Sequence, residues 1–192
     1  KANVFLCCSF SATPTAFSNQ YTIFSIAGEY IPPTFQTFST NWPFSLINFE
    51  FKNEAKKDYE SLFSYYSNTL QKELKGFGVL NYVSSHDDST PFDGKREKTF
   101  ESATKLLLTP GTAQVYYGDE SARNLVIDGT KGDATLRSFM NWDDIKNDPS
   151  TQKTLAHWQK LHQFRKNHPS VGSEEKQKIT AKPYVFSRSY SK

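Results

Sequence analysis

The chain has 192 residues, with 23 lysines and arginines against 20 aspartates and glutamates, so its formal net charge is only +3. This balance, without a basic cluster, argues against nucleic-acid binding, and no apolar run approaches the ~18 residues of a membrane span. The two cysteines, Cys7 and Cys8, are adjacent, which excludes a disulfide framework and a spaced metal-ligand pattern. The chain opens on Lys1 without a targeting signal, so we expect it to begin inside a longer coding sequence and assign it no compartment.

Residues 1–44 differ in composition from everything that follows them. Lys1 and Glu29 are their only charged side chains, whereas aromatic residues and prolines are frequent. The apolar residues show no sustained period of 2 or 3.6. We interpret 1–44 as a poorly specified segment, which is either a loop-rich stretch packed under other parts of a longer protein or a sequence translated out of frame.

From residue 45 onward, local patterns predict helices and strands in alternation. Apolar residues recur every three or four positions over 53–75, which predicts a helix that ends at Gly76. A short apolar, aromatic-rich run predicts a buried strand over 77–83. The polar residues 84–91 that follow have the composition of a turn.

The same alternation continues through the rest of the chain. A second helix is predicted over 96–108, a second buried strand over 112–117 and a long loop over 121–149. A third helix is predicted over 150–167, and the stretch 179–190 has β-type composition. The residues expected to face the core on the second and third helices are Phe100, Ala103, Leu106, Leu107, Leu155, Trp158, Leu161 and Phe164. Alternating strands and helices are typical of an α/β fold with a parallel sheet.

The candidate functional residues follow the two predicted strands. In parallel α/β folds the site lies where the strands end, at the carboxyl edge of the sheet. His86, Asp87 and Asp88 follow the first strand, and Asp119 and Glu120 follow the second. A histidine beside two carboxylates can bind sugar hydroxyls and stabilise a cationic transition state, but the same residues also cap turns and solvate surfaces. The pattern alone leaves both roles open.

Sequence blocks in a fixed order carry a resemblance to a known family. They are Phe77–Asp87, Leu106–Glu120, Leu136–Asp143 and Leu161–Val171. The first reads FGVLNYVSSHD and the second LLLTPGTAQVYYGDE, with room for one helix and one strand between His86 and Gly118. In this order the set resembles the alpha-amylase family of glycoside hydrolases over residues 45–190.

The resemblance implies an α/β fold that is a partial (β/α)8 TIM barrel, since a complete barrel takes ~250 residues. Residues 45–172 are then the C-terminal part of the catalytic barrel. Within it, 77–87 would be the seventh strand with its loop, and 112–118 the eighth strand. Residues 173–192 would begin a C-terminal β-sandwich domain, and 1–44 remain poorly specified.

The resemblance also implies roles for individual residues. Enzymes of this family are retaining glycosidases with a carboxylate nucleophile and a carboxylic acid. Asp87 matches a third catalytic carboxylate, which holds the sugar and stabilises its positive charge, and His86 matches the neighbouring residue that binds the sugar. The motif does not include Asp88, and for Asp119 and Glu120 we expect structural roles. Scaffold, packing or surface roles are expected for Arg137, Met140, Trp142, His157, His162 and His168.

The resemblance fails where the other two catalytic carboxylates belong. No stretch matches the Gly-x-Arg-x-Asp motif of the nucleophile, or the third-strand motif that often supplies a calcium ligand. Lys1–Leu6 resembles the strand before the acid, but Cys7–Ser9 stands where the family has Gly-Glu. Glu29 follows a glycine, yet it lies closer to Ser45 than the family's loop usually allows. We therefore expect the chain alone to be inactive and to hold no cofactor, and the sequence leaves open whether a full-length family member binds calcium.

Three functions compete at this point. The first is a part of a hydrolase that acts on alpha-1,4-glucosidic bonds in starch-like glucans or maltooligosaccharides. The second is a non-catalytic amylase-like module for carbohydrate binding or partner assembly, against which the His86–Asp87 pair argues. The third is an α/β enzyme of another class, which no phosphate-binding glycine loop, nucleophile elbow or metal cluster supports. Full-length relatives in the family are often extracytoplasmic.

Overall fold

A parallel sheet with helices on one face organises the molecule. The computed structural model describes residues 26–30, 45–75, 77–87, 90–173 and 175–190. The sheet has four strands in chain order: β1 (Ile26–Tyr30), β2 (Ser45–Asn48), β3 (Gly78–Asn81) and β4 (Thr112–Ala113). All neighbouring strands are parallel, so their carboxyl ends meet at one edge. This confirms the α/β fold class.

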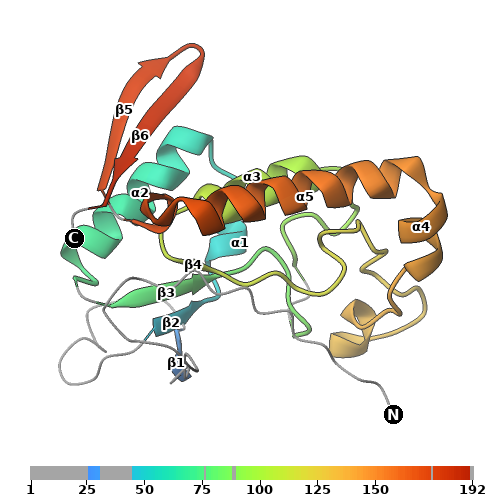
Figure 1. Ribbon diagram of the computed structural model, residues 1–192. Coiled ribbons are helices and arrows are strands. Elements are labelled where there is room, and N and C mark those ends of the chain that lie inside the picture. Colours follow the sequence, from blue (N-terminus) through green and yellow to red (C-terminus); the bar gives the residue numbers. More distant parts are fainter. Residues whose placement is uncertain (1–25, 31–44, 76, 88–89, 174, 191–192) are drawn as a thin grey trace, which may run out of the picture.

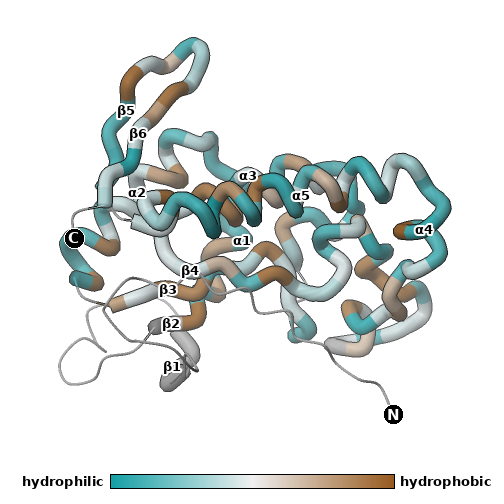
Figure 2. Tube along the Cα trace, in the orientation of Figure 1, coloured by the Kyte–Doolittle hydropathy of each residue, from teal (hydrophilic) through white to brown (hydrophobic). Residues whose placement is uncertain are grey.

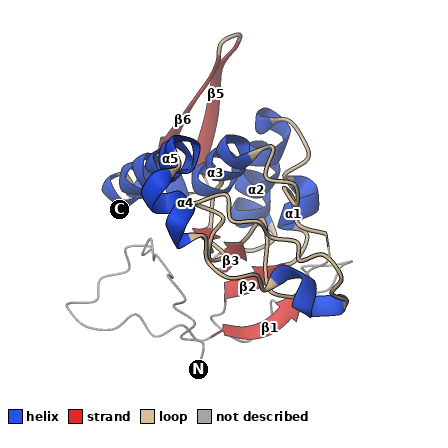
Figure 3. Ribbon diagram, turned by 90° about the vertical axis from the view of Figure 1, so that its right-hand side faces the viewer, coloured by secondary structure: helices blue, strands red, loops and turns tan. Residues whose placement is uncertain are grey.

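Helices connect the strands and cover one face of the sheet (Figures 1 and 3). They are α1 (Phe51–Glu54), α2 (Tyr59–Lys72), α3 (Thr99–Leu108) and α5 (Pro149–Asn167). The first two lie between β2 and β3 in the chain, and α3 lies between β3 and β4. Among the described residues, β2 and β3 are thus each followed by a helix before the next strand of the sheet begins, as the alternation in the sequence predicts.

The main core lies between this sheet and its helices. Its buried apolar side chains include Phe51, Leu62, Phe63, Tyr66, Val79, Val83, Ala103, Leu106, Leu107 and Trp158. Figure 2 shows apolar residues concentrated around β3 and α1, whereas apolar and polar residues alternate along α5. Each large apolar side chain in such a core contributes about 1.5–3 kcal/mol when it leaves water.

The helix predicted over 53–75 is in fact two helices, α1 and α2. Asp58 separates them because its backbone is extended, with φ −64° and ψ 164°. Its carboxylate accepts a hydrogen bond from the backbone N–H of Ser61 at 3.0 Å, so it acts as the N-cap of α2. The predicted apolar stripe is otherwise confirmed, since Ala55, Leu62, Phe63, Tyr66, Leu70 and Leu74 are buried.

The predicted boundaries of the next elements are too wide. The helix predicted over 96–108 begins only at Thr99, because Arg96 has a left-handed backbone with φ +59° that no helix accommodates. Of the strand predicted over 77–83, only Gly78–Asn81 is paired. Of the strand predicted over 112–117, only Thr112–Ala113 is paired.

The buried faces of the second and third predicted helices, which are α3 and α5, were predicted partly wrongly. Trp158 is 3% exposed, as expected, but Phe164 is 47% exposed and Phe100 on α3 is 40% exposed. The buried positions of α5 include Arg165, whose guanidinium donates to the carbonyls of Leu107 at 2.7 Å and of Thr109 at 3.0 Å. These carbonyls have no hydrogen-bond donor within α3, so the guanidinium of Arg165 is buried against them, and the neighbouring Phe164 remains at the surface.

The region predicted as a loop over 121–149 contains two short helices. They are η2 (Gly132–Leu136), a 3-10 helix, and α4 (Trp142–Asn147). After α5, a second 3-10 helix, η3 (Pro169–Gly172), leads into a separate antiparallel sheet of β5 (Glu175–Ala181) and β6 (Tyr184–Ser189). This hairpin bears out the β-type composition of 179–190, whereas the domain boundary at 172/173 stays a prediction. No helix among the described residues is long and apolar enough to cross a membrane.

Candidate functional site

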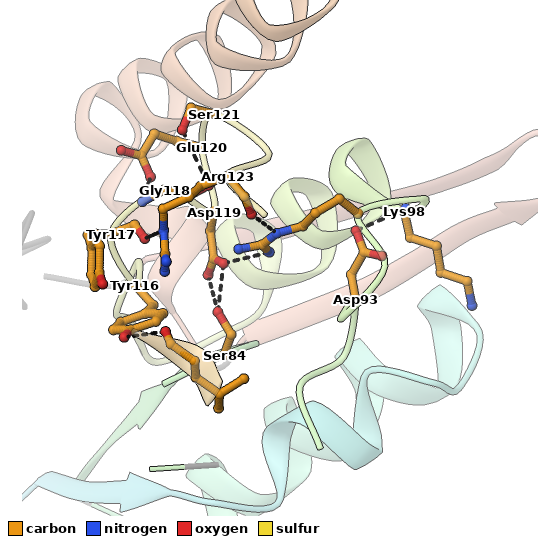
Figure 4. Close-up of polar contacts among 12 residues, drawn as sticks. Ser84, Asp93, Lys98, Tyr116, Tyr117, Gly118, Asp119, Glu120, Ser121 and Arg123 are labelled. Carbon is orange, nitrogen blue, oxygen red and sulfur yellow. Dashed lines mark hydrogen bonds and ion pairs between the residues drawn. The ribbon is translucent and has the colours of Figure 1, made fainter. Parts of the chain in front are cut away.

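The loops that follow β3 and β4 meet at the carboxyl edge of the sheet. Ser84 lies three residues beyond β3, and Asp119 lies beyond β4 on the neighbouring loop. The hydroxyl of Ser84 lies 2.6 and 2.7 Å from the two carboxylate oxygens of Asp119, to which it donates (Figure 4). The expectation that both loops lie together at this edge is therefore correct.

Asp119 is a buried carboxylate that joins the loop after β3 to the loop after β4. Only 1% of its side chain is exposed, and its Oδ1 lies 2.8 Å from Nη1 of Arg96. The same guanidinium donates through Nε to the backbone carbonyl of Arg123 at 2.7 Å. With its charge paired and both oxygens engaged, Asp119 stabilises the loop arrangement.

Arg123 forms the buried centre of the loop after β4. It donates through Nε to the carbonyl of Tyr117 at 2.9 Å and through Nη1 to the carbonyl of Ser138 at 3.0 Å. Its guanidinium also lies over the Tyr117 ring, 3.9 Å from the centroid. Burial lowers the pKa of this guanidinium. Gly118 has φ +85°, and a Cβ there would lie 2.5 Å from the Cβ of Arg123, so the close approach requires glycine.

Glu120 also has structural contacts. Its Oε2 accepts a hydrogen bond from the backbone N–H of Gly118 at 2.9 Å, which closes the turn. Burial raises the pKa of this carboxyl, and the nearby charge of Asp119 adds to the effect. The contacts of Asp119 and Glu120 are those of structural residues, the role predicted for both.

The exposed functional candidates form a second, separate cluster on the same edge. Nε2 of His86 lies 2.9 Å from Oδ1 of Asp87, and Nη2 of Arg137 lies 3.3 Å from the same oxygen. The side chains of His86, Asp87 and Arg137 are 58%, 53% and 50% exposed. The backbone N–H of Asp87 donates to the hydroxyl of Ser85 at 3.3 Å. A carboxylate at the surface between a histidine and an arginine can accept hydrogen bonds from a polar ligand and stabilise positive charge on it.

The contacts of Arg137 and Trp142 contradict their predicted scaffold roles. Arg137 pairs with Asp87, and Trp142 is 70% exposed and lies at the start of α4. Arg137 belongs to the exposed cluster, and sequence reasoning missed it because fifty residues separate it from Asp87. The only signal in the sequence was its place in a block that resembles the family's motif.

The remaining histidines have the packing roles predicted for them. The His157 ring lies 4.6 Å from that of Phe100, and the His168 ring lies 4.5 Å from that of Phe164. Burial lowers the pKa of His162. The rings of His157 and His168 pack against Phe100 and Phe164, which are 40% and 47% exposed.

Several candidates fall wholly or partly outside the described residues. Asp88 and the segments Lys1–Leu6 and Cys7–Ser9 lie outside them. Glu29 lies on β1, where its backbone is in register with Ile47 of β2. Glu29 therefore lies on a strand of the same sheet as β3 and β4, and its role as an acid stays a prediction.

No metal centre is found in the part of the chain that the structure describes. Nowhere among those residues do three or more His, Cys, Asp or Glu side chains lie close enough to hold a metal ion. Asp119 accepts from Ser84 and Arg96, and Glu120 accepts from the backbone of Gly118.

Comparison with known proteins bears out the resemblance. No family model matches the chain. The periplasmic alpha-amylase of Escherichia coli (strain K12) is 36% identical over 149 residues, which are 76% of this chain and 21% of that protein. The chain thus spans about a fifth of the length of this curated relative.

A solved structure shows the same fold. It is the cyclic alpha-maltosyl-(1→6)-maltose hydrolase from Arthrobacter globiformis in complex with maltose, with a TM-score of 0.50 and 23% identity. The match covers 70% of this chain and 31% of that one. Fold and site together define an α/β protein with polar residues on the loops after parallel strands. The chain belongs to the alpha-amylase family of glycoside hydrolases.

Proposed function

We propose that this chain is part of a retaining glycosidase that hydrolyses alpha-1,4-glucosidic bonds in starch-like glucans. Its four-stranded sheet is proposed to be one sector of a (β/α)8 barrel, with the hairpin β5–β6 as the start of a β-sandwich. The strand order supports this proposal, because the parallel strands neighbour each other in chain order and helices follow β2, β3 and β4, which is the construction of such barrels.

The exposed Asp87 carboxylate beside His86 is the observation that carries the proposal. It lies on a loop at the carboxyl edge, where barrel enzymes hold their sites. Glycosidic cleavage passes through an oxocarbenium-like transition state, in which positive charge develops on the sugar ring. Asp87 stabilises this charge electrostatically and accepts hydrogen bonds from sugar hydroxyls, while the imidazole of His86 contacts the sugar next to it.

The chain alone is proposed to be inactive. A retaining glycosidase needs a nucleophile and an acid about 5–5.5 Å apart. The sequence contains no Gly-x-Arg-x-Asp motif for the nucleophile, and Glu29 is the only candidate acid in a Gly-Glu pair before residue 45. Asp87 can stabilise the positive charge of the transition state, but without a nucleophile and an acid the chain cannot form that transition state.

A chimera tests the catalytic role of Asp87. The matched residues of this chain replace their counterparts in the periplasmic alpha-amylase, and turnover of maltoheptaose is measured for the chimera and for its Asp87→Asn and Asp87→Glu forms. Both substitutions are expected to lower turnover at least about 100-fold, because the first removes the charge and the second moves it beyond the ~0.5 Å tolerance of such sites. Unchanged thermal melts show that the fold is retained.

Near-normal turnover of the Asp87→Asn chimera would refute the assignment. The alternative function, a binding module without catalysis, is tested on the 192-residue chain by titration with maltoheptaose. Binding of equal affinity by the chain and by its Asp87→Asn form would favour a module whose ligand does not use Asp87.

A further inference from the structure

Arg137 reaches the candidate catalytic carboxylate from a distant part of the chain. It follows η2, fifty residues after Asp87, and its Nη2 lies 3.3 Å from Oδ1 of that residue. Its Nε points to the backbone carbonyl of His86 at 3.5 Å. One guanidinium therefore faces both members of the His86–Asp87 pair.

The two neighbours of Arg137 are held by the buried loop network. The carbonyl of Leu136 accepts from the hydroxyl of Tyr116 at 2.9 Å, and the side chain of Leu136 is 1% exposed. The carbonyl of Ser138 accepts from the hydroxyl of Tyr117 at 2.8 Å and from Nη1 of Arg123 at 3.0 Å. The backbone on either side of Arg137 is thus fixed to the core of the loop, which restricts where its side chain can reach.

The carboxylate of Asp87 is engaged on one side only. In the described part of the chain, His86 and Arg137 both contact its Oδ1. This leaves Oδ2 available for a ligand hydroxyl, on a side chain that is 53% exposed. A single pair between exposed groups is weak, but two partners on one oxygen also restrict rotation of the carboxylate.

We propose that Arg137 is a positioning residue for Asp87, which it holds so that Oδ2 faces the glucan. The proposal rests on the function proposed above and extends it to a residue outside the family's catalytic carboxylates. Lysine cannot replace Arg137 fully, because a lysine ammonium lacks the planar fork that contacts two groups at once.

The contact itself is tested without ligand, by NMR of the 192-residue chain. Rotation of the Arg137 guanidinium about its Nε–Cζ bond is expected to be slower in the unsubstituted chain than in Asp87→Asn, because the ion pair restrains it. Equal rotation rates in the two chains would refute the contact. This measurement does not depend on glucan binding. It therefore tests the Arg137–Asp87 contact even if the proposed function is wrong.

The consequence for ligand binding is tested by titration with maltoheptaose. Arg137→Gln is expected to weaken binding about 3- to 5-fold, and Arg137→Lys to restore part of the loss. Lys131→Gln is the matched control, since it removes one positive charge from an exposed position of the same loop and should change affinity less than about 1.5-fold. Thermal melts show that each variant is folded.

The outcomes separate the two proposals. Equal weakening by Arg137→Gln and Lys131→Gln would refute the positioning role, because general electrostatics would then explain the loss. The absence of binding by the unsubstituted chain would count against the proposed glucan site, and the NMR measurement then decides the role of Arg137.

Discussion

At the residue scale, two aspartates on adjacent loops have opposite surroundings. Asp119 is 1% exposed and paired with Arg96, whereas Asp87 is 53% exposed and has one open oxygen. A carboxylate with all its partners inside the protein has no capacity left for a ligand. Burial therefore separates the structural carboxylate from the candidate catalytic one, although both follow strands of the same sheet.

Asp119→Asn is predicted to destabilise the chain strongly. The substitution leaves Arg96, whose side chain is 10% exposed, as a charge inside the protein without its partner. Loss of one member of such a pair costs about 3 kcal/mol, which urea unfolding monitored by circular dichroism will measure. Asp87→Asn is the matched control and should change the free energy of unfolding by about 0.5 kcal/mol or less, because its pair is exposed. Similar losses in the two variants would contradict this account.

At the element scale, helix ends explain several buried charges. Arg165 of α5 satisfies the carbonyls at the end of α3, and its burial lowers the pKa to about 10. Lys105 of α3 donates to the carbonyls of Ala55 at 2.6 Å and Lys57 at 2.8 Å, just beyond α1. These cations are buried because they supply donors that the helix ends lack.

The N-cap of α5 gives a prediction about pH. Asp148 accepts from the side chain of Thr151 and from the backbone N–H groups of Thr151 and Ser150, and these hydrogen bonds lower its pKa. Because the pKa is lower in the folded state, the cap stabilises the fold above the unfolded pKa of about 3.9 and loses this effect as the pH falls through the folded value. Asp148→Ala should therefore lower the melting temperature at pH 7 but very little at pH 3.

Asp148→Asn is the control for this prediction. Asparagine also caps helices well but does not titrate, so its melting temperature should approach that of the unsubstituted chain at pH 7. It should also fall less on acidification than that of the unsubstituted chain. A constant difference between Asp148→Ala and the unsubstituted chain from pH 7 to pH 3 would show that the carboxylate charge is not what stabilises the cap.

At the scale of the whole molecule, the hairpin β5–β6 is attached to the parallel-sheet body through α2. Lys176, whose side chain is 3% exposed, lies 2.8 Å from the carboxylate of Glu60 and donates to Ser64 at 2.9 Å. Nearby, the rings of Phe63 and Phe186 lie 5.2 Å apart. A partly buried ion pair and an aromatic contact thus join the hairpin to α2.

Lys176→Gln is predicted to loosen the hairpin selectively. The substitution removes the charge that pairs with Glu60 and should cost about 1 kcal/mol. Hydrogen exchange should become faster in β5 and β6 and change little in β3 and α3. Lys178→Gln, at an exposed position of the same strand, should leave exchange unchanged. Faster exchange throughout the molecule would show that hairpin and body unfold as one unit.

The sequence by itself determined the α/β class, most element positions and the family. These follow from local rules: apolar spacing sets the buried faces of α2 and α3, and the order of the motif blocks carries the resemblance. The strands β1 and β2 and the helices η2, η3 and α4 were missed, because each is short and has no periodic pattern of its own. The separation of α1 from α2 at Asp58 was missed as well, since a cap can interrupt an apolar stripe without changing it.

Only the tertiary structure decided how the charged residues divide into pairs. It placed Arg137 on Asp87 and Arg96 on Asp119, across fifty and twenty-three residues of chain. Such pairs depend on which loops meet at the sheet edge, and a pattern of neighbouring residues contains no information about that. The sequence has 23 basic and 20 acidic residues, but these numbers do not show which of them form ion pairs with each other. The fold decides the pairs, because it determines which side chains lie close together.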